Sequence, residues 1–215
     1  YDIQDNGCRS YTYISTMGML MEACIEHDKE LIILDRPNPL GGEKIEGCLV
    51  EDGYISFVSQ FKIPYLYGQT PGELALYLNA TDYENKCKLT VVKMKGWKRD
   101  MTWDETGLEW VVASPHVPHG QSAIFYPVTG IFGEFSYISI GVGYTLPFEV
   151  MGAPWISADT LAEAMNALEL PGLEFRPIYY KPYYSTFKGE LCQGVQIHIL
   201  DYEKARLSEV QFLVV

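Results

Sequence analysis

The stretch over residues 31–42, LIILDRPNPLGG, constrains the fold more than any other part of the chain. Four consecutive aliphatic residues are too few for a buried helix and are typical of a strand covered on both faces, as in a parallel sheet. Two prolines remove backbone donors and a glycine pair permits positive φ, so the strand cannot continue. We therefore expect a rigid loop to present Asp35, Arg36 and Asn38 at the carboxyl end of a strand, where open α/β sheets bind ligands.

The residues before this strand complete one crossover unit. The first five residues, YDIQD, have the pattern of the end of a strand and finish in Asp5, and a turn at NG follows. Residues 11–29 carry apolar side chains at helical spacing. Strand, helix and strand in this order form a right-handed crossover of a parallel sheet, so Asp5 and Asp35 should lie at one edge. Arg9 and Tyr11 stand at the start of the helix and should face the same edge.

Further patterns predict the remaining elements of both halves. A proline at the first turn predicts a helix over residues 71–80, and KLTVVKMK predicts a strand over 88–95. Residues 157–168 have the pattern of a capped amphipathic helix. LEFRPIYY and GVQIHILD are typical of two strands of a mixed sheet. The glycines and aromatic residues of 126–147 indicate short extended pieces joined by turns.

We therefore predict an α/β protein with two subdomains. Residues 1–125 would form the C-terminal part of a Rossmann-like parallel-sheet subdomain, and residues 126–215 a smaller mixed α/β subdomain. The chain starts without a methionine and ends inside an apolar run, so we expect an internal fragment of a longer protein.

Composition excludes several functions. The net charge of −12 repels a nucleic-acid backbone and an anionic membrane surface, so we expect no nucleic-acid partner. No apolar run reaches the roughly 18 residues of a membrane span.

The five cysteines show no CxxC spacing, which favours buried free thiols, with one disulfide as the alternative. The stretch GVG at 141–143 lacks both the Walker lysine and the GxGxxG pattern, so no nucleotide cofactor is expected.

Several side chains are candidates for chemistry. Glu134 lies among aromatic residues in FGEFS, surroundings that favour a protonated carboxyl suited to a general acid, and a solvated surface glutamate is the alternative. His116 and His119 in SPHVPH lack a third ligand and a regular helix, so hydrogen bonding to substrate or backbone is favoured over metal binding. Three tryptophans of residues 97–110 could stack on sugar rings or pack a core.

Many of these blocks together resemble one protein family. DIQDNGCRSYTY, LDRPNPLGG, MKGWKRDM, SPHVPH, YPVTG, GVGYTLPFE and GAPW are similar, in this order, to motifs of the NamZ-type exo-β-N-acetylmuramidases, long catalogued as a domain of unknown function. The resemblance implies a glycoside hydrolase that releases terminal N-acetylmuramic acid from peptidoglycan fragments, outside the cytoplasm in the periplasm or the extracellular space. It also implies a Rossmann-like subdomain joined to a smaller one.

The residues that match family motif positions form the candidate site. They are Asp5, Arg9, Tyr11, Tyr13, Asp35, Arg36, Asn38, Glu46, Glu73, Trp97, Arg99, Glu134 and Trp155. Family members carry an upstream Pro-Glu-His-Gly motif whose glutamate is the favoured catalytic carboxylate, and that segment is not in this chain. Many members also read Gly-Arg-Gly where this chain has Val142 between its two glycines.

Glycosidic cleavage usually needs one carboxyl as acid and a second as base or nucleophile. We expect Glu134 to be the catalytic carboxyl, with Asp35 second and no metal. Arginine and asparagine side chains would bind the sugar's carboxylate, hydroxyls and N-acetyl group, and tyrosines would stack on the sugar or hydrogen-bond to it. Together with the two loop histidines, the expected substrate-binding residues are Asp5, Arg9, Tyr11, Tyr13, Arg36, Asn38, His116 and His119. A non-catalytic glycan-binding module and a nucleotide-dependent enzyme are the competing hypotheses.

Overall fold

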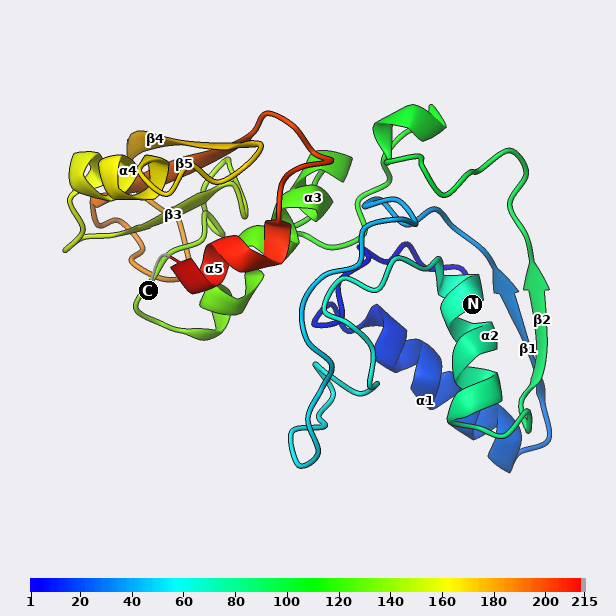
Figure 1. Cartoon of the computed structure of the whole chain (residues 1–215). Coiled ribbons are helices and arrows are strands. Elements are labelled where there is room, and N and C mark those ends of the chain that lie inside the picture. Colours follow the sequence, from blue (N-terminus) through cyan, green and yellow to red (C-terminus); the bar gives the residue numbers. More distant parts are fainter. Residues whose placement is uncertain (214–215) are drawn as a thin grey trace. The chain divides into compact units, whose positions relative to one another are not determined.

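The computed structural model describes residues 1–213 of the chain. It separates into two compact units, Tyr1–Ala113 and Ser114–Val215 (Figure 1). The first contains a parallel sheet and the second an antiparallel sheet. The prediction of an α/β fold is therefore confirmed. The predicted boundary after residue 125 lies within a helix of the second unit.

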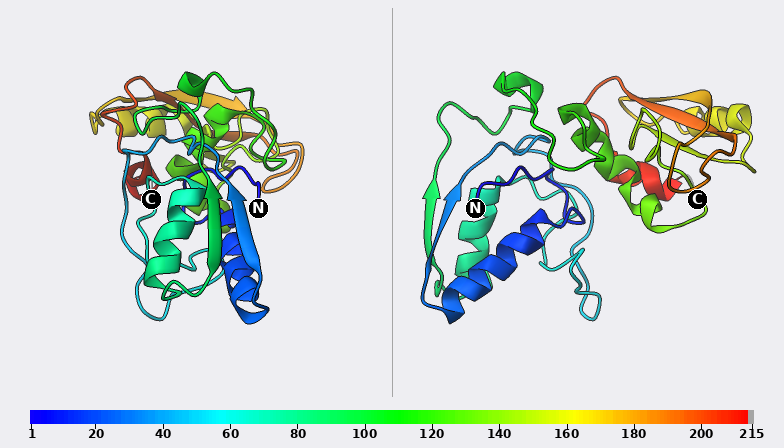
Figure 2. Two further views of the ribbon diagram at one scale, coloured as in Figure 1. Left: turned by 90° about the vertical axis from the view of Figure 1, so that its right-hand side faces the viewer. Right: turned by 180° about the vertical axis from the view of Figure 1, so that it is seen from behind.

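The first unit is built on a pair of parallel strands. α1 (Tyr13–Glu26) precedes β1 (Glu30–Leu34), and α2 (Pro71–Thr81) precedes β2 (Lys88–Val92). The strands pair in parallel with Ile33 opposite Val91. Both helices lie on one side of the pair (Figure 2). The predicted helices over residues 11–29 and 71–80 and the predicted strands over 31–34 and 88–95 are thus confirmed, with different bounds at several ends.

One face of this sheet forms the core of the unit. Leu31 and Ile33 point into a cluster with Met17, Leu74 and other buried side chains from both helices. The alternate residues of β1 are exposed, Ile32 to 46% and Leu34 to 45%. The expectation that this strand is covered on both faces is therefore wrong for the residues that the structure describes.

The first residues do not form the predicted strand. The Tyr1 amino group donates to the carbonyl of Ile32 (2.7 Å), and the backbone N–H of Leu34 donates to the carbonyl of Tyr1 (2.9 Å). Tyr1 therefore bonds to the two residues that flank Ile33, as a residue of a parallel strand does with its neighbour. The segment therefore runs beside β1 as a strand would, although its regular pairing does not extend further.

The second unit holds a three-stranded sheet of order β3-β5-β4. Its strands are β3 (Val150–Ala153), β4 (Leu173–Tyr180) and β5 (Cys192–Ile199), and α4 (Ala158–Asn166) packs against the last two. All neighbouring strands are antiparallel, so the predicted mixed sheet is wrong. Phe175 pairs with Ile197 on one face, where both are buried.

The stretch expected to be extended is largely helical. α3 (Gly120–Thr129) is followed directly by a 3₁₀ helix (Gly130–Glu134), and a short 3₁₀ helix (Leu207–Glu209) leads into α5 (Val210–Leu213). Pro127 lies inside α3, and burial of Phe125 and Val128 stabilises the helix despite it. The prediction of extended pieces from residue 126 is therefore wrong for residues 126–134.

Two further expectations concern cysteines and membranes. All five cysteines are free thiols, three of them buried, while Cys24 is partly buried and Cys48 is exposed. Over residues 1–213, no helix combines the length and apolar character that crossing a bilayer requires.

Candidate functional site

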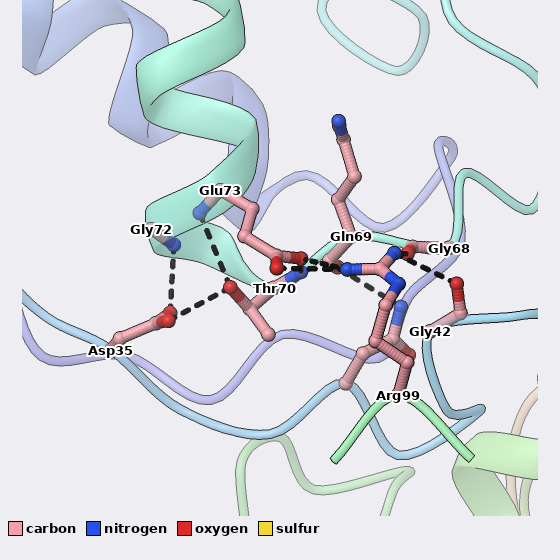
Figure 3. A network of polar contacts seen from close by, with 9 residues as sticks. Asp35, Gly42, Gly68, Gln69, Thr70, Gly72, Glu73 and Arg99 are labelled. Carbon is pink, nitrogen blue, oxygen red and sulfur yellow. Dashed lines mark hydrogen bonds and ion pairs between the residues drawn. The ribbon is translucent and has the colours of Figure 1, made fainter. Parts of the chain in front are cut away.

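Asp35 leaves β1 and meets the first turn of α2. Its Oδ1 accepts a hydrogen bond from the backbone N–H of Gly72 (2.8 Å), and its Oδ2 accepts one from the Thr70 hydroxyl (2.8 Å) (Figure 3). Thr70 and Glu73 form a reciprocal capping box at the same turn. The free N–H groups and the positive end of the helix dipole thus hold the Asp35 carboxylate in one orientation.

Arg99 connects this turn to two loops. One guanidinium nitrogen donates to both carboxylate oxygens of Glu73 (2.8 and 2.9 Å), and the other donates to the carbonyls of Gly42 and Gly68 (2.8 and 2.5 Å) (Figure 3). Its guanidinium carbon also lies 6.0 Å from the centre of the Trp97 ring. Arg99 therefore fixes the loop after β1 against the start of α2.

A pocket of about 330 Å³ opens at this position. Asp35, Glu73, Lys93, Met94 and Trp97 line it. Partial burial raises the pKa of the Asp35 carboxyl, whereas the hydrogen bonds that it accepts lower the pKa. The pocket thus combines two carboxylates, one ammonium group and an aromatic ring, a set that can bind a polar ring such as a sugar.

Asp5 lies in the same unit but inside the protein. Its Oδ2 accepts hydrogen bonds from the Tyr67 hydroxyl and from the backbone N–H of Gly7 (2.8 Å). Burial raises the pKa of its carboxyl to about 7, although those two hydrogen bonds lower the pKa. The neighbouring Gln4 amide donates to the carbonyl of Pro37 (2.8 Å), so this segment lies beside the loop that follows β1. Asp5 is not among the residues that line the pocket beside Asp35.

Arg9 is buried, and its guanidinium is engaged by backbone carbonyls. One of its nitrogens donates to the carbonyls of Cys48 and Ile63 (2.7 and 2.5 Å), and its Nε donates to the Ser59 hydroxyl (3.4 Å). This geometry favours a role in bracing the long loop between β1 and α2. A substrate-binding role for Arg9 stays a prediction.

Asn38 and Arg36 are also engaged within the first unit. The Asn38 side chain accepts from the backbone N–H of Leu40 (2.9 Å) and donates to the carbonyl of Gln69 (3.0 Å), so it shapes its own turn. Arg36 forms an ion pair with Asp2 at 2.5 Å, and both side chains are partly exposed. Arg36 is therefore the more accessible of the two for a ligand.

The aromatic candidates of the first unit are half-buried or buried. Tyr11 and Tyr13 form an edge-to-face pair with ring centres 4.6 Å apart, and the Tyr13 hydroxyl donates to the carbonyl of Ala113 (2.5 Å). Trp103 is buried and packs edge-on against Trp110 at 4.8 Å. Trp103 is thus a core residue, and of the three tryptophans over 97–110 it is Trp97 that lines the pocket beside Asp35.

The histidines and Glu134 belong to the second unit. His119 caps α3, where its Nδ1 accepts from the backbone N–H of Ser122 (3.3 Å). The His116 ring stacks on Tyr184, with centres 5.8 Å apart. Among residues 1–213 no group of three or more potential ligands could hold a metal ion. His119 thus bonds to the backbone of its own helix, and His116 contacts an aromatic ring.

A second pocket, of about 240 Å³, is lined by residues of this unit alone. Glu134 and His116 line it together with the aromatic side chains of Tyr126 and Phe148, and Val142 forms part of the wall. Glu134 is exposed, so the apolar burial expected from its aromatic neighbours does not occur. Glu134 is nevertheless one of the residues that line this concave surface.

Thr70, which bonds to Asp35, and two pocket residues, Lys93 and Ser139, were not predicted as site residues from the sequence. The sequence TPGE over 70–73 has the capping-box pattern, which could have identified Thr70 as a helix cap. Lys93 and Ser139 have no such signal, because pocket walls are formed by residues distant in sequence.

These features define an α/β protein in which a strand-end aspartate, fixed by a helix N-terminus, lines a polar pocket. The comparisons with known proteins agree with the motifs. Residues 1–121 match the family model for the N-terminal part of the exo-β-N-acetylmuramidase NamZ, and residues 124–215 match the model for its C-terminal part. The chain belongs to the NamZ family.

Individual relatives give the same result. The chain is 47% identical over 204 residues to the peptidoglycan β-N-acetylmuramidase NamZ of Bacillus subtilis (strain 168). The matched region covers 95% of this chain and 49% of that protein. Two crystal structures of DUF1343 family proteins from Bacteroides fragilis NCTC 9343 are also similar. The first is 63% identical to this chain, with a TM-score of 0.94, and the match covers 99% of this chain and 56% of that protein. The second is 30% identical, with a TM-score of 0.73, and the match covers 90% of this chain and 51% of that protein. The chain therefore spans about half the length of these relatives.

Proposed function

We propose that this chain is part of a glycoside hydrolase that releases terminal N-acetylmuramic acid from peptidoglycan fragments. The observation that carries the proposal is 47% identity, over nearly the whole chain, to a peptidoglycan β-N-acetylmuramidase. The polar pocket beside Asp35 supports it, because it offers carboxylates and an aromatic ring to a sugar-sized ligand.

The proposed division of labour follows the positions of the carboxyl groups. Asp35 is held by the start of α2, so it could position a sugar hydroxyl or act as a base without reorientation. Glu134 is solvent-accessible and lines the second pocket, which suits exchange of a proton with water. The second essential carboxyl is expected in the Pro-Glu-His-Gly segment of the longer family members.

Turnover of a chromogenic muramic acid glycoside by the full-length protein tests this function. We expect hydrolysis, and we expect Asp35→Asn and Glu134→Gln each to lower kcat by about a hundredfold or more. Asp100→Asn is the control, because Asp100 is exposed and contributes to neither pocket. Absence of turnover by the full-length protein would reject the function, and wild-type rates in both variants would reject the two assignments.

A glycan-binding protein without catalysis is the second candidate. It is favoured by the hydrogen bonds that both Asp35 oxygens already accept, because lone pairs that are engaged within the chain are less available to a substrate. In that case the full-length protein would retain muramyl glycans on a column but leave the chromogenic glycoside intact.

The site of action follows from the proposed substrate. Peptidoglycan lies outside the cytoplasmic membrane, so we propose a periplasmic or extracellular location. Fractionation of cells that express the full-length gene tests this: the protein should be found with a periplasmic or secreted marker rather than with a cytoplasmic one.

A further inference from the structure

The segment over residues 93–99, KMKGWKR, is strongly basic although the chain is acidic. It contains four of the 16 lysines and arginines and no acidic residue, whereas the whole chain has a net charge of −12. Its three lysines, Lys93, Lys95 and Lys98, are all exposed. A local concentration of positive charge attracts anions even where the whole chain repels them. The segment therefore favours an anionic ligand at this part of the first unit.

Of these three lysines, Lys93 is the one that lines the pocket beside Asp35. It follows directly after β2, whose residues Leu89 and Val91 pack toward the helices. Because side chains alternate along an extended segment, Lys93 lies on the same side as Val91, where the pocket opens against α2. The side chain is exposed, so a ligand in the pocket can reach its ammonium group.

The two carboxylates of this pocket are engaged within the chain, and Lys93 is not. Asp35 accepts hydrogen bonds at the start of α2 and from the backbone, and Glu73 is paired through both oxygens with Arg99. Among residues 1–213, by contrast, no ion pair or hydrogen bond engages the Lys93 ammonium group. The pocket thus presents two compensated anions and one uncompensated cation, which is the arrangement that a ligand carboxylate completes.

We infer that Lys93 binds the carboxylate of the sugar in this pocket and selects N-acetylmuramic acid over uncharged sugars. The ammonium group would donate a charged hydrogen bond to the lactyl carboxylate, which is the group that N-acetylglucosamine lacks. The Trp97 ring on the same wall would contact the apolar C–H surface of the sugar. The inference rests on the proposed function, and it assigns the selectivity to a residue that precedes the family-like block MKGWKRDM.

Calorimetric titration of the full-length protein with N-acetylmuramic acid and with its methyl ester tests the inference. The ester keeps the ring and the acetamide but carries no negative charge. We expect the acid to bind at least about tenfold more tightly, because the ester cannot form the charged hydrogen bond. Lys93→Met should weaken binding of the acid about tenfold and leave binding of the ester unchanged, and Lys93→Arg should preserve the preference for the acid.

Lys98→Met is the matched control. It removes the same charge from the same basic segment, but Lys98 does not line the pocket. Because solvent and salt screen a charge at a distance, its affinities for the acid and for the ester should both stay within about twofold of wild type.

Several results would overturn the inference. These are absence of binding of the acid, equal affinity of the wild type for acid and ester, and equal losses in Lys93→Met and Lys98→Met variants that melt at the wild-type temperature. The outcome is separable from that of the proposed function, since binding requires no turnover. Hydrolysis without a preference for the acid would reject the role of Lys93 alone, and a preference that depends on Lys93 without hydrolysis would reject the catalytic function alone.

Discussion

The two sheets differ in the side chains that they expose to water. In the first unit β1 and β2 bury one face under two helices and leave Ile32, Leu34 and Val92 about half exposed on the other. In the second unit the exposed positions of β4 include Glu174 and Arg176, so water meets polar side chains. Antiparallel sheets commonly face water on one side, and parallel sheets rarely do. The first sheet thus has the composition of a sheet with cover on both faces, although only one is covered here.

The largest effect should come from the covered face of β1. Ile33 is fully buried, so Ile33→Ala removes packed atoms and should lower the free energy of unfolding by about 2–5 kcal/mol. Ile32→Ala, one residue away on the other face, should cost less than about 1 kcal/mol. Urea denaturation of both variants measures the difference. Equal costs would contradict the division of the strand into a covered and an uncovered face.

The Arg99 clamp should be next in size. Arg99→Ala removes charged hydrogen bonds to Glu73 and to two carbonyls, so we expect a loss of about 2 kcal/mol in unfolding free energy. Arg99→Lys should recover only part of it, because an ammonium group cannot reproduce the forked geometry. Lys98→Ala is the control at an exposed neighbour. Wild-type stability in Arg99→Ala would show that the clamp is not stabilising.

The buried Asp5 should make the stability depend on pH. Its pKa in the folded protein, about 7, lies above the ordinary value of 3.8, so the protonated form is favoured by folding. The resulting stabilisation is complete below about pH 4 and is lost as the pH rises through 7. Asp5→Asn should flatten this slope and stabilise the protein at pH 8 by on the order of 1 kcal/mol. Thermal denaturation from pH 4 to 8 tests it, and a wild-type slope in the variant would refute the assignment.

The smallest change in stability should come from the uncovered face. Threonine is β-branched and suits a strand, so Ile32→Thr with Leu34→Thr should alter the unfolding free energy by no more than about 0.5 kcal/mol per site. The same pair should reduce binding of a hydrophobic dye, because these side chains are exposed. Undiminished dye binding would indicate that the dye reports another surface.

Local patterns predicted most of the regular elements. The aliphatic run of β1, the proline at the start of α2 and the amphipathic pattern of α4 each depend on neighbours in sequence, and the structure confirms these three elements. Ser157 stands at the N-cap of α4, but its side chain makes no capping hydrogen bond. α3 was not predicted, because Pro127 and the following glycines obscure its pattern and its burial involves distant residues. Strand direction in the second unit was also missed, since alternation along a strand does not encode the direction of its partner.

The candidate site was predictable in its residue types but not in their environments. The position of Asp35 at a strand end follows from the sequence, whereas its fixation by Thr70 joins residues far apart in the chain. Burial of Asp5 and of Arg9 likewise depends on the long loop between β1 and α2, whose path no local pattern specifies. Functional roles for these residues remain predictions.

The way α2 begins has a consequence for phosphorylated ligands. In folds that bind nucleotides, the positive first turn of such a helix receives a phosphate from outside. Here a carboxylate of the same chain, on Asp35, already neutralises that turn. An incoming phosphate would have to displace the Asp35 carboxylate, which is covalently attached to the adjacent strand and therefore always close to this helix start. The unit thus has the outline of a nucleotide-binding half with its anion position already filled from within.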